Sequence, residues 1–307
     1  MPKRDFLTVT DLSRAELEDT LALAGRLKAD LARGRLRPPL AGKVLALLFH
    51  KPSLRTRVSF DSGMARLGGT ALYLTDQEIG MGSRESVADV ARVLSRYVDG
   101  IMIRTFSHRW VEELAEHASV PVVNGLTDSF HPCQILADLL TVGEALGSVE
   151  GRKIVFVGDG NNVARSWINA ARRIPFPFTL CCAKGYEPDA GFLAEARADG
   201  AEVTVESDPL RAVEGADVVY TDVWASMGQE KEAEARARVF QPYQVNSSLL
   251  TRARPEAIVL HCLPAHRGQE ITDEVIDGPQ SRVFDQAENR LHAQNALLVR
   301  LLGEGWS

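Results

Sequence analysis

The stretch Lys43-Val-Leu-Ala-Leu-Leu-Phe49 leads directly into His50-Lys-Pro-Ser-Leu-Arg-Thr-Arg57, and these two segments decide the class of fold. The first segment is an apolar run of strand length. The second opens a helical pattern over about residues 53–67, which stops at Gly68-Gly69. A buried strand that passes straight into a helix is typical of a βαβ unit, in which the next strand runs parallel to the first.

Outward from this unit, apolar runs alternate with helical patterns along most of the chain. Ser13 and Glu16 have the spacing of a capping box and predict the start of the first helix. Further strands are predicted at residues 70–74, 100–103, 120–123, 153–157, 178–182, 202–205, 217–220 and 257–261. We therefore expect an α/β fold of two doubly wound parallel-sheet domains joined by helices.

The domain boundaries follow from length and from one uninterrupted helical pattern. A chain of 307 residues has the length of about two domains. The pattern at residues 132–146 contains no turn signal and indicates a connector between the halves. We predict a first domain at residues 1–135, a second at 136–285, and a C-terminal helix at 286–307 that packs back on the first.

Composition excludes several classes of protein. The formal net charge is −6 and the isoelectric point about 5.7, which argues against a nucleic-acid binder or a partner of anionic membranes. No apolar run approaches the ~18 residues of a membrane span, and the N-terminal residues lack the apolar segment of a secretory signal. The four cysteines form no C-x-x-C pair. We expect a cytoplasmic protein with reduced thiols and no metal.

Ligands of such sheets bind beyond the carboxyl ends of the strands, so the residues there are the candidates for function. In the first half these residues are hydrogen-bond donors, and no nucleophile stands out. They are Ser53, Arg55, Thr56, Arg57, Arg104, His131 and Gln134. Read alone, Ser-x-Arg-Thr is equally consistent with a capped helix whose arginines pair with surface acids. The combined set suits an anion at a helix N-terminus and a carbonyl whose oxygen becomes negative.

The second half opens with Ile154-Val-Phe-Val-Gly158-Asp-Gly160-Asn-Asn162-Val163, which resembles a dinucleotide-binding fingerprint. The third glycine position holds Val163, and the next strand ends without the acid that binds a ribose hydroxyl. We therefore do not expect a nicotinamide cofactor. Asn162 offers an amide at the same edge of the predicted sheet.

Three further segments follow later strands. Asp222 is suited to hold an ammonium group, and Ser226-Met227-Gly228 to form a closing loop, although an ordinary loop acid beside a mobile turn is the alternative. His261 and His266 lack the spacing of a metal-ligand pair and a nearby third ligand. Cys262, at a strand end, is a candidate nucleophile, but no residue next to it in the sequence can act as its base. A base that is close only in space, such as Asp222, remains an alternative.

At this point the motifs resemble those of the ornithine carbamoyltransferases, within the aspartate/ornithine carbamoyltransferase family. The resemblance covers essentially the whole chain. Its motifs are Phe49 to Phe60, Ala91 to Ser95, His131-Pro-Cys-Gln134, Gly158-Asp-Gly-Asn-Asn162, Asp222-x-x-x-Ser-Met-Gly228 and His261-Cys-Leu-Pro-Ala-His-Arg-Gly268. The first and third are shared by carbamoyltransferases in general, and the last three point to ornithine.

The resemblance implies roles for individual residues and no cofactor. Carbamoyl phosphate would be bound by Ser53, Leu54, Arg55, Thr56, Arg104, His131, Gln134, Cys262, Leu263 and Arg290. Thr56, Arg104 and His131 would polarise its carbonyl, and Cys262 would act beside the δ-amine of L-ornithine. The α-amino and α-carboxylate groups of ornithine would be held by Asn162, Asp222, Ser226 and Met227. The family habit implies a homotrimer or a multiple of trimers.

The chain departs from the family pattern at three places. Leu54 stands where many members have Thr, which a backbone contact tolerates. Gly80 falls where many members have a Gln that reaches the neighbouring subunit's site. We assign that role to no residue here; Gln77 and Glu78 are the candidates to replace the missing Gln. Gln269 stands where Glu is frequent.

Three alternatives compete with ornithine carbamoyl transfer. One is a carbamoyltransferase for another amine, such as N-acetylornithine or putrescine. The second is a regulatory homologue that binds ligand without turnover. The third is a nicotinamide dehydrogenase, if the loop at Gly158 and Gly160 has been misread.

Overall fold

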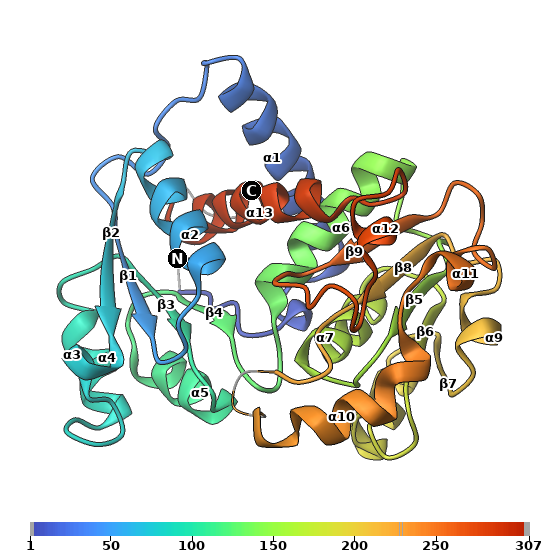
Figure 1. Cartoon of the computed structure of the whole chain (residues 1–307). Coiled ribbons are helices and arrows are strands. Elements are labelled where there is room, and N and C mark those ends of the chain that lie inside the picture. Colours follow the sequence, from blue (N-terminus) through green and yellow to red (C-terminus); the bar gives the residue numbers. More distant parts are fainter. Residues whose placement is uncertain (1–2, 227, 229, 304–307) are drawn as a thin grey trace. The chain divides into compact units, whose positions relative to one another are not determined.

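The computed structural model describes residues 3–226, 228 and 230–303. The chain divides into two compact units (Figure 1). The first comprises residues 1–140 and 288–307, and the second residues 141–287. The boundaries fall inside two helices, α6 (Pro132–Leu146) and α13 (Val283–Leu302), so each of these helices belongs partly to both units.

The first unit is built on a four-stranded sheet in the order β2-β1-β3-β4, with every neighbouring pair parallel. The strands are β1 (Val44–Phe49), β2 (Thr70–Thr75), β3 (Gly100–Arg104) and β4 (Val122–Leu126). The helical elements of this unit before α6 are η1 (Val9–Asp11), α1 (Arg14–Ala32), α2 (Leu54–Arg66), α3 (Asp76–Ile79), α4 (Val87–Leu94) and α5 (His108–His117).

Side chains on the two faces of this sheet pack against different helices. Ala46 and Leu48 of β1 share a buried cluster with Val90 of α4 and Val111 of α5. On the opposite face, Leu302 of α13 lies against Gly100, where an added Cβ would meet its side chain at 2.7 Å. Because successive strand residues point to opposite faces, the all-apolar β1 is explained by helices on both sides.

The second unit has a five-stranded parallel sheet in the order β7-β6-β5-β8-β9. Its strands are β5 (Ile154–Val157), β6 (Phe178–Cys181), β7 (Val203–Glu206), β8 (Val218–Thr221) and β9 (Ile258–His261). Its helical elements are α7 (Asn162–Ala171), α8 (Ala190–Ala198), α9 (Pro209–Val213), η2 (Glu230–Glu232), α10 (Ala233–Phe240), η3 (Gln241–Tyr243), α11 (Ser247–Leu250) and α12 (Asp273–Ile276).

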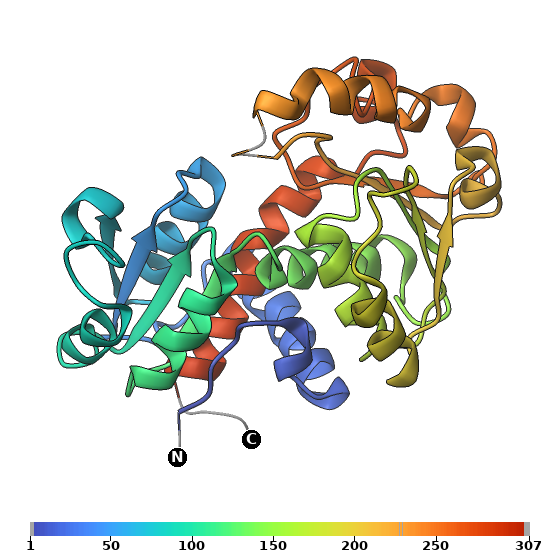
Figure 2. The same ribbon diagram turned by 90° about the horizontal axis from the view of Figure 1, so that it is seen from below.

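Both faces of this second sheet are covered. In Figure 2 the orange segment around α10 lies on one side of the sheet and the yellow-green α7 on the other. On the α10 side, Phe240 belongs to a buried cluster with Val155 and Val219. On the α7 side, the Trp167 ring lies 5.9 Å from that of Tyr220, which stacks on Phe156 at 5.3 Å.

The strand orders place a topological switch point in each unit. In the first, β2 lies on one side of β1 and β3 on the other, so the loops after β1 and β3 diverge. In the second, β6 and β8 flank β5, and the loops after β5 and β8 diverge in the same way. The crevices at such points are where open α/β sheets bind ligands.

The predicted α/β class with two parallel sheets is confirmed, while several boundaries differ. The strand expected at residues 120–123 is β4, at Val122–Leu126, and the last helix begins at Val283, three residues before its predicted start. The short helices α3, α9, α11 and α12 were not predicted because four or five residues carry too little periodicity. Within the described residues, no helix is long and apolar enough to cross a membrane.

Candidate active site

The N-terminus of α2 forms the floor of the first cluster of site residues. Ser53 is its N-cap, and its hydroxyl accepts a hydrogen bond from the Thr56 amide at 3.2 Å. The remaining amides of the first turn include those of Leu54 and Arg55, and Leu54 exposes 75% of its side chain. The fold does not require this side chain for packing. A helix N-terminus of this kind attracts anions.

Around this turn the structure brings together donors from four places in the chain. Nη1 of Arg104, at the end of β3, lies 3.4 Å from Oγ1 of Thr56. Nη2 of Arg290, on α13, lies 3.4 Å from the same hydroxyl, while its Nη1 donates to Oε1 of Gln134 at 2.7 Å. Gln134 in turn donates to Asp138 on α6 at 2.8 Å. These side chains are all buried, so two guanidinium groups meet at one threonine in a low-dielectric site.

His131 completes this first cluster as a neutral group. It is buried, and burial lowers the pKa of its imidazole well below 6.5, with the charges of Arg290, Arg104 and Arg55 adding to the effect. A neutral imidazole can donate one N–H to an oxygen while staying uncharged itself. The cluster therefore combines permanent cations with a neutral donor.

Sequence reasoning missed Lys51, which lies between β1 and α2. The side chain is only 4% exposed, and its ammonium group pairs with Asp128 and lies 4.2 Å from the centre of the Phe106 ring. Because Asp128 lies in the loop that leads to His131, the pair ties the loop after β1 to the loop after β4. A lysine next to a strand is too common in sequences to have been singled out.

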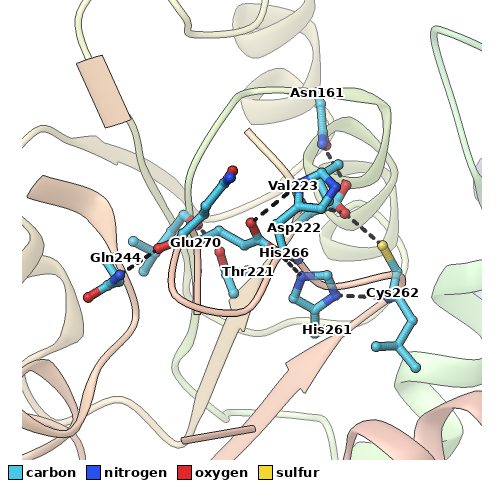
Figure 3. A network of polar contacts seen from close by, with 12 residues as sticks. Asn161, Thr221, Asp222, Val223, Gln244, His261, Cys262, His266 and Glu270 are labelled. Carbon is cyan, nitrogen blue, oxygen red and sulfur yellow. Dashed lines mark hydrogen bonds and ion pairs between the residues drawn. The ribbon is translucent and has the colours of Figure 1, made fainter. Parts of the chain in front are cut away.

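The second cluster is built around the Asp222 carboxylate, at the end of β8 (Figure 3). Its Oδ1 accepts from the Val223 amide at 2.8 Å and lies 2.9 Å from Sγ of Cys262, which follows β9. Its Oδ2 accepts from Nδ2 of Asn161 at 2.8 Å. The spatial partner that sequence analysis left open for Cys262 is therefore present in this structure.

The other residues expected to bind ornithine lie close to these positions in the chain. Asn162 is the first residue of α7, and Ser226 lies in the loop after Asp222. Met227 lies outside the described residues. Asn161, which sequence analysis passed over, is the residue whose side chain both caps α7 and holds Asp222. An Asn one position before a predicted helix is an N-cap signal that would have identified it.

Arg236 of α10 was also missed, and it anchors the loop after β8. Its Nη1 donates to the Trp224 carbonyl at 3.0 Å and to Oδ2 of Asp159 at 2.8 Å. Asp159 lies in the loop after β5, beside Gly160 and Asn161. The two loops of this switch point are therefore connected by an ion pair between buried Arg236 and half-buried Asp159.

His261 and Glu270 lie behind Cys262 and Leu263. Nδ1 of His261 accepts from the Leu263 amide at 2.9 Å, and its Nε2 lies 3.1 Å from Oε1 of Glu270. His261, Cys262 and Asp222 also offer atoms within 4.8 Å of one another, a spacing compatible with a metal ion. In a neutral imidazole, however, the one lone pair is here engaged by the Leu263 amide. A metal would have to break that hydrogen bond, so these residues do not fit a metal site as they stand.

The loop at residues 76–85 differs from the family pattern in a defined way. Gly80 ends α3 with φ 61°, and the Arg84 side chain lies across it, donating to the carbonyls of Glu78 and Ile79 at 2.6 and 3.0 Å. Glu78 caps α3 through Thr75, whereas Gln77 is exposed. Among the residues that the structure describes, no hydrogen bond joins Gln77 or Glu78 to either of the two clusters.

Comparison with known proteins gives a consistent result over the whole chain. Residues 4–144 match the family model described as the aspartate/ornithine carbamoyltransferase carbamoyl-P binding domain, and residues 150–301 match the model of the Asp/Orn binding domain. Among similar curated proteins, the ornithine carbamoyltransferase of Syntrophus aciditrophicus is 56% identical over 98% of this chain and its own full length. That of Thermococcus kodakarensis is 52% identical over 98% of this chain and 96% of its own.

Solved structures agree. The ornithine carbamoyltransferase from Pyrococcus furiosus superimposes with a TM-score of 0.94 at 49% identity, covering 99% of this chain and 98% of its own. The enzyme from Thermus thermophilus gives 0.88 at 49% identity, covering 97% and 99%. The two family models, the relatives and the two parallel sheets lead to one conclusion: the chain belongs to the aspartate/ornithine carbamoyltransferase family.

Proposed function

We propose that this protein transfers the carbamoyl group of carbamoyl phosphate to the δ-amine of L-ornithine, giving L-citrulline and phosphate. The observation that carries the proposal is the convergence of Arg104 and Arg290 on Thr56 in the first turn of α2. The buried His131 lies near enough to both arginines for their charges to lower the pKa of its imidazole. This arrangement provides fixed positive charge for a phosphate and donors for a carbonyl oxygen. The full-length identity with ornithine carbamoyltransferases supports ornithine as the acceptor.

The first unit is assigned to carbamoyl phosphate. The phosphate is taken by the amides of the first turn of α2, by the Ser53 and Thr56 hydroxyls, and by the guanidinium groups of Arg55, Arg104 and Arg290. The carbonyl oxygen is polarised by Thr56, Arg104 and His131. The Gln134 side-chain oxygen orients Arg290 by accepting its hydrogen bond. We also assign Gln134 to the binding of the carbamoyl amide.

The second unit is assigned to ornithine. Asp222 supplies the carboxylate for an ammonium group, while Asn162, Ser226 and Met227 contact the amino-acid end. Cys262 and Leu263 stand beside the δ-amine and the carbamoyl group. The Cys262 thiol donates a hydrogen bond to the Asp222 carboxylate, so the two side chains are held together at this position.

The reaction follows from these assignments. The neutral δ-amine forms a bond to the carbonyl carbon, and the π electrons move to the oxygen, where the donors of the first unit hold the charge. The C–O bond to phosphate then breaks and the phosphate leaves with that electron pair. The amine proton is transferred to the leaving phosphate, so no side-chain base has to be regenerated. Exclusion of water protects carbamoyl phosphate from hydrolysis.

The test is an assay with carbamoyl phosphate and, separately, ornithine, N-acetylornithine, putrescine and aspartate. The proposal is supported if citrulline is formed and the kcat/KM for ornithine is at least a hundredfold above that for each of the other three acceptors. Turnover of another amine overturns the assignment of the second unit and leaves that of the first. Binding of carbamoyl phosphate by calorimetry without turnover of any amine identifies a regulatory homologue.

The dehydrogenase alternative is disfavoured by the loop after β5. The amide of Gly160 donates to the Tyr186 carbonyl at 3.0 Å, and a Cβ at Gly160 would meet that oxygen at 2.5 Å. A pyrophosphate needs the backbone of such a loop to be accessible, whereas residues 186–188 cover it here. Titration with NADH followed by fluorescence checks this directly.

We further infer a homotrimer, or a multiple of trimers, acting in the cytoplasm in arginine biosynthesis. The family resemblance supports the assembly. The exposed apolar side chains of Leu54, Val58 and Leu72 on the first unit offer a surface that contact between subunits would cover. Light scattering coupled to gel filtration tests the assembly, and a monomer mass would refute it. Complementation of an arginine auxotroph tests the pathway.

A further inference from the structure

Leu263 has a backbone conformation that few residues of its kind adopt. Its φ is +56°, in the left-handed region, which is uncommon for a residue with a bulky side chain. Residues remain in such conformations only where their surroundings determine them strongly. Leu263 follows Cys262 directly, so whatever holds Leu263 also fixes the direction in which the Cys262 thiol points.

The contact that holds Leu263 comes from the preceding strand end. The amide of Leu263 donates to Nδ1 of His261 at 2.9 Å. This bond leaves the proton of a neutral imidazole on Nε2, which lies 3.1 Å from Oε1 of Glu270. His261 is 1% exposed and Glu270 is fully buried, so water does not compete for either hydrogen bond. Figure 3 shows His261 between Cys262 and Glu270.

Glu270 is itself fixed on several sides. Its Oε1 also accepts from the His266 amide at 2.6 Å, and its carbonyl accepts from the Val245 amide at 2.8 Å. Gln244 donates to the carbonyls of Gly268 and Gln269 at 2.9 and 2.8 Å. One carboxylate oxygen therefore joins both ends of the loop from His261 to His266, while backbone carbonyls anchor residues 268–270 to the segment at Gln244 and Val245.

We propose that His261 and Glu270 are a positioning pair that sets the conformation of Cys262 and Leu263 for the transfer step. This inference rests on the proposed function. Neither side chain contacts substrate: Glu270 orients the imidazole, the imidazole holds the Leu263 amide, and the Cys262 thiol is thereby kept 2.9 Å from Asp222. Displacements of about 1 Å in such a site lower turnover by up to ~100-fold.

Two amide substitutions at His261 separate the two hydrogen bonds. The short side chain of His261→Asn can place an oxygen near the position of Nδ1 and keep the acceptor for Leu263. The longer side chain of His261→Gln places its amide near Nε2 and loses that acceptor. We expect kcat to fall by about 10- to 100-fold in His261→Gln and by less than about threefold in His261→Asn. The KM for carbamoyl phosphate stays within about twofold in both.

The acceptor at position 270 is tested in the same way. Glu270→Ala leaves the buried Nε2–H of His261 without its carboxylate, and Glu270→Gln restores a carbonyl oxygen. We expect kcat to fall about tenfold or more in Glu270→Ala and to recover in Glu270→Gln. Val275→Ala is the packing control, since Val275 belongs to the buried cluster against which Leu263 packs and its side chain offers no hydrogen bond to the network. It should lower the unfolding midpoint without lowering kcat.

A second readout does not depend on activity. Cys262 is the one cysteine of four that is not buried, so iodoacetamide reports on its thiol. When Leu263 is released, Cys262 turns away from its carboxylate partner, and alkylation becomes at least threefold faster in His261→Gln and Glu270→Ala than in wild type. Unchanged alkylation in folded variants, or a loss of kcat that Val275→Ala reproduces, overturns the positioning pair. Absence of citrulline formation by wild type overturns the proposed function instead, while the alkylation rates still decide the geometry.

Discussion

The thiol of Cys262 lies 2.9 Å from a carboxylate oxygen of Asp222, although the two residues are 40 positions apart in the chain. The contact exists because β8 and β9 are neighbours in the sheet and both end at the same edge. Asp222 is in turn held by Asn161, from the loop after β5. Three loops therefore converge on one carboxylate, which makes Asp222 the residue whose replacement separates the roles of the two units.

Asp222→Asn should impair the use of ornithine while leaving carbamoyl phosphate binding intact. The neutral amide keeps the size of the side chain but lacks the charge for an ammonium group. We expect the KM for ornithine to rise by at least tenfold, and the dissociation constant of carbamoyl phosphate to change by less than about twofold. Steady-state kinetics and calorimetry measure the two quantities. An unchanged dependence on ornithine would remove Asp222 from the binding site.

Arg104→Ala removes a donor from the proposed oxyanion site of the first unit. Loss of one such donor typically lowers turnover by about 10²- to 10³-fold. His131→Ala should cause a loss of the same order, through the neutral donor. Arg92→Ala is the control, because Arg92 is exposed and its guanidinium pairs with Asp89 at 3.2 Å, outside the candidate site. Near-normal kcat in both Arg104→Ala and His131→Ala would contradict the assignment.

His131 should make the protein less stable as the pH falls below 6.5. Burial and three arginines lower the pKa of its imidazole in the folded protein, whereas the unfolded chain takes up a proton near pH 6.5. Below that pH the unfolded state binds more protons, so the free energy of unfolding decreases by up to ~1.4 kcal/mol per pH unit. The loss continues until the lowered pKa is reached.

The measurement is urea unfolding of wild type and His131→Gln between pH 5 and pH 7.5. Burial lowers the pKa of His50 as well, and this contribution remains in both proteins. The free energy of unfolding should therefore depend less steeply on pH in the variant. Parallel curves would show that His131 does not stay neutral in the folded protein.

The sequence predicted the elements better than their arrangement. The apolar strands and the capping box at Ser13 and Glu16 are local signals; the capping box is at the expected residues and the strands lie within a few residues of theirs. The strand orders depend on which neighbours pair, which no local pattern specifies, and these orders create the two switch points. The partnership of His261 with Glu270 was missed because it joins two residues that look unremarkable in sequence. The donors at strand ends were noticed because parallel strands all end at one edge.

Gly160→Ala tests whether the loop after β5 controls the second cluster. A Cβ at this position would meet the Tyr186 carbonyl oxygen at 2.5 Å and the Pro188 nitrogen at 2.9 Å, so the backbone must move. Because Asn161 follows directly, we expect a higher KM for ornithine together with a stability loss of about 1–3 kcal/mol. Gly143→Ala is the matched control, since its Cβ enters open space on α6. It should leave kinetics unchanged and stabilise the helix by about 0.5–1 kcal/mol.

Cys262 should be the single thiol that reacts in the folded protein, and ornithine should protect it. Burial raises the pKa of Cys133 and of Cys182 to about 12, and that of Cys181 still further, so these thiols stay protonated and inert. Mass spectrometry after iodoacetamide treatment should find one carbamidomethyl group, on Cys262, and a parallel loss of transferase activity. Cys262→Ser should resist inactivation and retain part of the turnover, because its hydroxyl can still donate to Asp222. Modification at Cys133, Cys181 or Cys182 in the folded protein, or reaction at Cys262 at the same rate with saturating ornithine, would show that the thiol does not border the ornithine site.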